Sequence, residues 1–125
     1  MTQDQPEPSL LVAIGEAMVV LVPEAGRPLS QAVEFGSDVG GAEFNVATGV
    51  ARQGFPAAFV SRLGEDGFGE RILRVAADAG VDVSAVERDP ERLTGLYVKE
   101  RLAGERGITA RMRYYRRESA ASALS

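Results

Sequence analysis

The sequence predicts an α/β fold in which a parallel sheet is flanked by helices and is followed by an antiparallel β region. Two stretches with apolar residues at helical spacing each end at a glycine, Gly54 and Gly80. Apolar runs of strand length lie before and after them, and strands that alternate with such helices form βαβ units with a parallel sheet. Beyond residue 93 apolar and polar residues alternate, which is typical of antiparallel strands.

Composition is that of one ordinary folded domain, with 125 residues of which 45% are hydrophobic and 26% charged. Because the sequence has no cysteine and no histidine, disulfides and thiolate or imidazole metal sites are excluded, and we expect no metal site. Residues 1–9 are polar and lack the pattern of a secretory signal, so we expect a loose tail, a domain at 10–125 and a cytoplasmic location.

The first half of the domain should begin with a central strand at 10–14, an apolar run that suits a strand covered on both faces. The run continues after Gly15 and Glu16 but is too short and too interrupted to span a membrane. We expect a hairpin next, with strands at 18–22 and 31–35, and then a helix at 42–53.

The next unit should contain a short strand at 57–60 and a helix that Asp66 caps and Gly80 ends. A single helical stripe carries its apolar residues, Phe68, Ile72, Val75, Ala76 and Ala79. A further short strand is predicted at 81–86, followed by a polar link at 87–93.

The last part should form an antiparallel hairpin over 94–116 with a turn at 103–107. Its first strand has an apolar face with Leu96, Val98 and Leu102, and a second face with Tyr97, Lys99 and Arg101. Residues 94–117 hold seven Lys/Arg and two Asp/Glu, although the whole chain has a net charge of −4. This basic segment could attract an anion, whereas the acidic chain as a whole argues against nucleic acid as a partner.

The stretch from Gly40 to Ala47 is the candidate ligand-binding element. Adjacent glycines, Gly40 and Gly41, allow a sharp turn and a close approach of backbone to a ligand. Glu43 suits the dipole of the first helical turn, where Asn45 could meet a polar ligand. The alternative is a structural one, a turn followed by a small-residue helix packed close to a sheet.

This stretch resembles the first signature of the ribokinase-like (PfkB-type) carbohydrate kinases. The residues that carry the resemblance are Gly40, Gly41, Asn45, Val46, Ala47, Gly54 and Gly64. Many members have a small residue or proline where this chain has Glu43, and the form found here is similar to that of the 2-keto-3-deoxygluconate kinases. The resemblance implies a ribokinase-like fold, here with an incomplete parallel sheet, and an antiparallel lid over the sugar, formed by strands at about 17–36 and 94–116.

The resemblance also implies the site residues. The expected substrate-binding residues are Gly41, Asn45, Tyr97, Tyr114, Tyr115 and Arg116, and Glu43 could cap or buttress the turn. A tyrosine offers a sugar a flat apolar face and one hydroxyl group, and a guanidinium binds a carboxylate through two parallel hydrogen bonds. A sugar acid has both a sugar skeleton and a carboxylate, so tyrosine and arginine together suit it. The structural alternative is that the tyrosines are cross-strand pairs and the arginines form a solvated strand edge.

No Gly-Ala-Gly-Asp-like motif occurs in the sequence, and in the family this motif carries the catalytic aspartate. We therefore expect the N-terminal part of a kinase that uses ATP and Mg²⁺, marginally stable and inactive alone, with no catalytic residue of its own.

The leading hypothesis for the substrate is a sugar acid such as 2-keto-3-deoxygluconate. The alternatives are a neutral-sugar kinase of the ribokinase or fructokinase type, and a non-catalytic lid or dimerisation module. Because lid strands often pair between subunits in this family, a homodimer or a higher oligomer is expected for a full-length protein.

Overall fold

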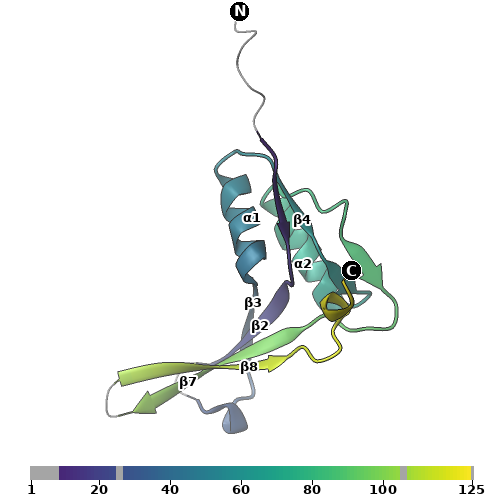
Figure 1. The fold of residues 1–125 in the computed structure, drawn as a ribbon. Helices are drawn as coiled ribbons and strands as arrows, with labels where there is room; N and C mark the ends of the chain where they lie inside the picture. Colours follow the sequence, from purple (N-terminus) through teal and green to yellow (C-terminus); the bar gives the residue numbers. More distant parts are fainter. Residues whose placement is uncertain (1–8, 25–26, 105–106, 125) are drawn as a thin grey trace, which may run out of the picture.

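The computed structural model describes residues 9–24, 27–104 and 107–124 and has the α/β fold that the sequence predicts. Two helices and short parallel strands form a body, from which a longer sheet projects (Figure 1). The body consists of strands β1 Leu11–Ile14, β4 Ala57–Val60, β5 Arg62–Gly64 and β6 Glu87–Asp89, helices α1 Ala42–Arg52 and α2 Gly67–Asp78, and the 3-10 turn η2 Ala120–Ala123.

The projecting sheet, which we call the lid sheet, has the strand order β3-β2-β7-β8. Its strands are β2 Met18–Pro23, β3 Phe35–Gly40, β7 Leu96–Gly104 and β8 Gly107–Tyr115. β2 pairs with β3 and β7 pairs with β8, both antiparallel, and β2 runs parallel to β7. The two predicted hairpins therefore join into one sheet rather than standing apart.

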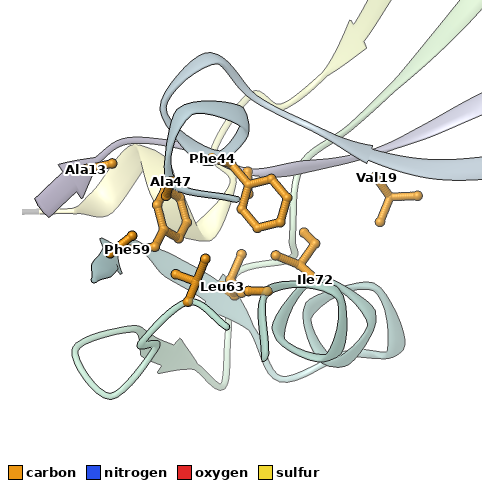
Figure 2. Packing of buried hydrophobic residues seen from close by; sticks show 11 residues of the cluster. Ala13, Val19, Phe44, Ala47, Phe59, Leu63 and Ile72 are labelled. Carbon is orange, nitrogen blue, oxygen red and sulfur yellow. The ribbon is translucent and has the colours of Figure 1, made fainter. Parts of the chain in front are cut away.

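The core lies where α1 and α2 pack against the parallel strands. β1 and β4 pair in parallel, and Phe44 of α1 meets Phe59 of β4 edge to face, with ring centroids 5.5 Å apart. Leu63 and Ile72 are buried in the same cluster (Figure 2). Aromatic burial with this geometry makes Phe44 and Phe59 main contributors to the stability of the body.

Both helices begin and end close to the predicted residues because their caps are encoded locally. Gly54 and Gly80, which follow α1 and α2, each have a φ of 89°, a left-handed conformation that favours glycine. The Asp66 carboxylate accepts a hydrogen bond from the backbone N–H of Gly69 at 2.8 Å, as expected of an N-cap. On the predicted stripe of α2, Ile72 and Ala76 are buried, but Phe68 is 36% exposed.

Three predictions about strands are wrong, and each has a physical reason. β1 is not covered on both faces: Val12 is 49% and Ile14 61% exposed, because within the described residues the helices cover only the face that carries Ala13. The strand returning to β2 is β3, at 35–40 rather than 31–35, since residues 29–31 form a 3-10 turn. This shift extends the first lid segment beyond the expected residue 36.

The third wrong prediction is the strand at 81–86. Asp82 makes only an isolated parallel bridge with Ala58, after which its carboxylate accepts a hydrogen bond from the N–H of Ser84 and turns the chain. The strand occurs later, as β6, inside the segment predicted to be a polar link. There Arg62 of β5 pairs with Glu87 and Asp89, so ion pairs take the place of apolar contacts.

No helix in the described ranges has the length and apolar character needed to cross a membrane.

Candidate functional site

A cavity of about 370 Å³ opens where the body meets the base of the lid sheet. The lining comes from four parts of the chain that are distant in sequence: the β1–β2 link with the start of β2, the start of α1, β7, and the end of β8 with the residue after it. The lining residues are Glu16, Met18, Gly41, Ala42, Glu43, Asn45, Tyr97, Tyr114 and Arg116. The structure thus brings together all the expected site residues except Tyr115.

Gly41 lines this cavity and Gly40 lines the neighbouring one of about 410 Å³, and neither position has room for a side chain. A β-carbon on Gly41 would collide with the backbone carbonyl oxygen of Glu16, and its φ of 140° favours glycine. A β-carbon on Gly40 would lie 2.5 Å from the hydroxyl oxygen of Tyr97. These positions allow the β1–β2 link and the Tyr97 side chain to approach the helix start closely.

Asn45 lies in the first turn of α1, where its backbone N–H donates to the Gly41 carbonyl at 2.8 Å. Its exposed side chain lines both the first cavity and a second one of about 410 Å³ that also contains Tyr97 and Lys99. An amide at this junction can both donate to and accept from the hydroxyl groups of a ligand.

Tyr97 and Tyr114 are directly opposite each other on β7 and β8, with ring centroids 5.3 Å apart and an angle of 36° between the rings. Burial, together with the neighbouring Tyr114 and Asp38, raises the pKa of Tyr97. Its hydroxyl group therefore stays protonated at neutral pH and can donate a hydrogen bond into the cavity. The tyrosines are thus a cross-strand pair, as the structural alternative held, and also part of the cavity lining.

Arg116 follows the end of β8 and is the positively charged residue among those that line the cavity. Its guanidinium carbon lies 4.8 Å from the centroid of the Tyr114 ring, a cation–π arrangement. Nη1 is 3.8 Å from Oε1 of Glu16, and the Arg116 side chain is 54% exposed. The guanidinium therefore lies at the mouth of the cavity, accessible to a ligand.

Glu43 and Tyr115 differ in how well they fit their expected roles. The Glu43 side chain lies along Gly15, where a β-carbon would be 2.5 Å from its Oε2, an arrangement that suits a buttress for the β1–β2 link. Tyr115 pairs with Leu96 on the other face of the lid sheet and lines a separate cavity of about 650 Å³. Adjacent residues of a strand point to opposite faces, so Tyr114 and Tyr115 cannot both face one site.

A hydrogen-bond network fixes the start of β7 to the body. The second carboxylate oxygen of Asp66 accepts from the N–H of Thr94 at 2.9 Å, and the Thr94 hydroxyl accepts from the N–H of Gly64 at 2.9 Å. Burial opposes ionisation of Asp66, but hydrogen bonds from the Thr94 and Gly69 N–H groups outweigh it and lower its pKa. The sequence identified Asp66 as a helix cap but not as the residue that also holds the lid strand.

Glu16, Met18 and Ala42 line the cavity but were not among the expected site residues. Met18 is buried at the start of β2 and contributes apolar surface. Glu16 interrupts an apolar run directly after β1, and a charge at the carboxyl end of a parallel strand was a usable signal for a site residue.

The cavity has paired tyrosines, an amide and one guanidinium and lies under a sheet that projects from an α/β body, an arrangement that suits a small polar ligand. The family model described as "pfkB family carbohydrate kinase" matches residues 8–121, and the chain belongs to this family.

Two curated relatives illustrate the similarity. The 2-dehydro-3-deoxygluconokinase of Bacillus subtilis is 39% identical over 116 residues, which are 91% of this chain and 35% of the relative. Fructokinase-1 of Oryza sativa subsp. japonica is 42% identical over 113 residues, 89% of this chain and 34% of the relative. The chain thus spans about a third of the length of each of these relatives.

Solved structures agree with this assignment. The chain is similar to a PfkB protein from Polaromonas sp. JS666, with a TM-score of 0.84 and 35% identity, covering 95% of this chain and 39% of that one. It is also similar to a fructokinase from Xylella fastidiosa with bound ATP, with a TM-score of 0.73 and 29% identity, covering 92% of this chain and 35% of that one. The ribokinase-like fold expected from the sequence is therefore confirmed.

Proposed function

We propose that this chain is the sugar-binding part of an ATP-dependent carbohydrate kinase whose substrate is a sugar acid of the 2-dehydro-3-deoxygluconate type. The observation that carries the proposal is the convergence of Asn45, Tyr97, Tyr114 and Arg116 on one cavity. Tyrosine and asparagine can hydrogen-bond sugar hydroxyl groups, and the accessible guanidinium of Arg116 can bind a carboxylate in bidentate fashion.

A neutral sugar is the second candidate, and a specific observation favours it. The cavity contains two carboxylates, Glu16 and Glu43, against the single guanidinium of Arg116. Carboxylates accept hydrogen bonds from the hydroxyl groups of a neutral sugar and repel an acid. The fructokinase relative has similar identity to the sugar-acid kinase relative, so sequence similarity does not separate the two substrates.

The phosphoryl donor in the proposal is ATP, by analogy with the fructokinase solved with bound ATP, and the family resemblance adds Mg²⁺. The charges of the described cavity do not fit a triphosphate, because two of its three charged side chains are carboxylates. We therefore assign no step of phosphoryl transfer to these residues and expect no turnover by the 125-residue chain alone. A non-catalytic role remains the alternative for the chain alone.

Pairing of two chains through the lid strands also remains a proposal. The apolar face from which we expected it is partly covered, since Val98 is 7% exposed and Leu96 is half-buried, and the Leu102 side chain lies outside the described residues. Among the lid-sheet side chains that the structure describes, Phe35, Met112 and Tyr115 are apolar, exposed and outside the candidate site. A second copy could pack against these residues.

Titration of the ¹⁵N-labelled chain with 2-dehydro-3-deoxygluconate and with fructose tests the proposed function. Saturable amide shifts should concentrate at Asn45, Tyr97 and Tyr114, while Ser84, in a turn of the body, serves as an internal control. The acid should bind more tightly than fructose. Absence of saturable shifts at the cavity, or shifts spread evenly over the chain, would contradict sugar binding.

A chimera tests the same proposal through activity. Residues 8–121 replace the corresponding segment of the Bacillus subtilis relative, and ATP-dependent phosphorylation of both sugars is measured. Preference for the sugar acid is the expected result. A preference for fructose would favour the neutral-sugar candidate.

A further inference from the structure

The carboxylate of Glu16 is fixed at the edge of the candidate site by two segments from the other end of the chain. Ser119, just after the lid sheet, donates its hydroxyl hydrogen to Oε2 of Glu16 at 2.7 Å. On another side Gly95 packs so closely that a β-carbon there would lie 2.7 Å from the same Oε2. A single position is thus strongly favoured for this carboxylate, whose side chain is only 21% exposed.

The other carboxylate oxygen faces the guanidinium of Arg116. Oε1 of Glu16 and Nη1 of Arg116 are 3.8 Å apart, within ion-pair range but too far for a hydrogen bond. The guanidinium also lies 4.8 Å from the centroid of the Tyr114 ring. Arg116 is therefore held between an aromatic ring and a fixed negative charge, and part of its attraction for an anion is offset before any ligand binds.

We propose that Glu16 is a specificity-determining residue, which competes with a ligand carboxylate for Arg116 and so sets the preference between sugar acids and neutral sugars. The inference rests on the proposed function, that a sugar occupies this cavity. A ligand carboxylate can bind the Arg116 guanidinium only by displacing the Glu16 carboxylate from it. A neutral sugar leaves that pair intact and can use the Glu16 carboxylate as an acceptor.

The direct test is Glu16→Gln, which removes the charge but keeps an oxygen that can accept the Ser119 hydrogen bond. Dissociation constants for 2-dehydro-3-deoxygluconate and fructose are measured for the chain and the variant. The ratio of acid to neutral-sugar affinity should rise by about three- to tenfold, as expected when one partly solvated charge is removed. The matched control is Glu100→Gln, because Glu100 pairs with Arg113 at 3.9 Å and neither residue lines this cavity. An unchanged ratio, or a fall in acid affinity, would overturn the inference.

A second measurement needs no sugar. The Nε–H resonance of Arg116 should shift in Glu16→Gln and stay in place in Glu100→Gln, and an unchanged resonance would also overturn the inference. In an Arg116→Ala background, Glu16→Gln should leave the ratio of affinities almost unchanged, whereas persistence of the full effect would show that Glu16 acts on the ligand directly. If the parent chain binds neither sugar, the proposed function fails, while the Arg116 resonance still decides whether Glu16 engages the guanidinium.

Discussion

Replacement of Arg116 by alanine gives the sharpest test of how the cavity would recognise a carboxylate. The variant removes the guanidinium from the Tyr114 ring and from Glu16, the two groups that hold it. It keeps the β-carbon, which faces Gly95 and would lie 3.2 Å from a β-carbon built there. The packing of the chain beneath the cavity should therefore be unchanged, and the effect should be on the ligand.

The expected magnitude follows from the exposure of the side chain. Loss of one partner from a buried charge pair at an interface costs roughly 2 to 5 kcal/mol. Because the Arg116 side chain is 54% exposed, water screens the interaction, and we expect a loss of about 1 to 2 kcal/mol for a sugar acid, which is roughly a 5- to 30-fold weaker affinity. A neutral sugar loses at most an ordinary hydrogen bond of about 1 kcal/mol.

Titration calorimetry with 2-dehydro-3-deoxygluconate and fructose measures both losses for the same preparation. Arg113→Ala, Arg111→Ala and Arg117→Ala are the controls, because these arginines do not line the cavity. Their replacement should alter the salt dependence of binding and little else. Should Arg116→Ala weaken both sugars by the same factor, or neither, the carboxylate-binding role of Arg116 is wrong.

Three further predictions concern stability. Hydrogen bonds from the backbone N–H groups of Arg92 and Glu91, and then from Arg62, lower the pKa of Asp89 from 3.8 to about 2. The ionised carboxylate therefore stabilises the folded chain above about pH 4, and this stabilisation is lost as the pH falls toward 2. The difference in melting temperature between the parent chain and Asp89→Asn should narrow over that range. Gly41→Ala should destabilise the chain by about 1 to 3 kcal/mol in urea unfolding, whereas Gly49→Ala, in a helix with open space around it, should stabilise it by about 0.5 to 1 kcal/mol. Phe44→Ala should cost about 3 to 5 kcal/mol, and a loss no larger than that of the exposed Phe55→Ala would contradict the central place of Phe44 in the core.

The elements that the sequence predicted well are those whose ends are encoded locally. Helix α1 ends before Gly54, and α2 begins at the cap of Asp66 and ends before Gly80. The hairpin formed by β7 and β8 followed from alternation of side chains, which is also a local property. In each case a few neighbouring residues determine where the element begins or ends, or which face each side chain occupies.

The elements that were missed depend on partners far away in the chain. β3 includes Gly36, Ser37 and Asp38, which have low strand propensity, and its position follows from the register with β2. β6 forms because Glu87 and Asp89 pair with Arg62 of β5, which lies on the other side of α2 in the sequence. The parallel pairing of β2 with β7, which joins the two hairpins, involves segments separated by two helices, and no local pattern reports it.

The family resemblance pointed to most residues that line the cavity, and the sequence alone could have placed Tyr115 outside it. Period-two alternation along β8 places Tyr114 beside Tyr97 and sends Tyr115 to the opposite face, so only one of the adjacent tyrosines could line the cavity. Glu16 was harder to assign, because its partner Ser119 lies 103 residues away.

The charges of the cavity determine how a preference for an acid could arise. If a ligand carboxylate lay about 3 Å from the guanidinium and about twice as far from each of two carboxylates, attraction and repulsion would cancel, because Coulomb energy falls with the inverse of distance. The charged lining residues Glu16, Glu43 and Arg116 give the cavity a net negative charge, so net charge alone does not favour an acid. Selection must come from the direction of the guanidinium hydrogen bonds, and these must outweigh the loss of the Glu16 ion pair. Arginine supplies that directional fork, whereas lysine, a point charge, would face the same two carboxylates without it.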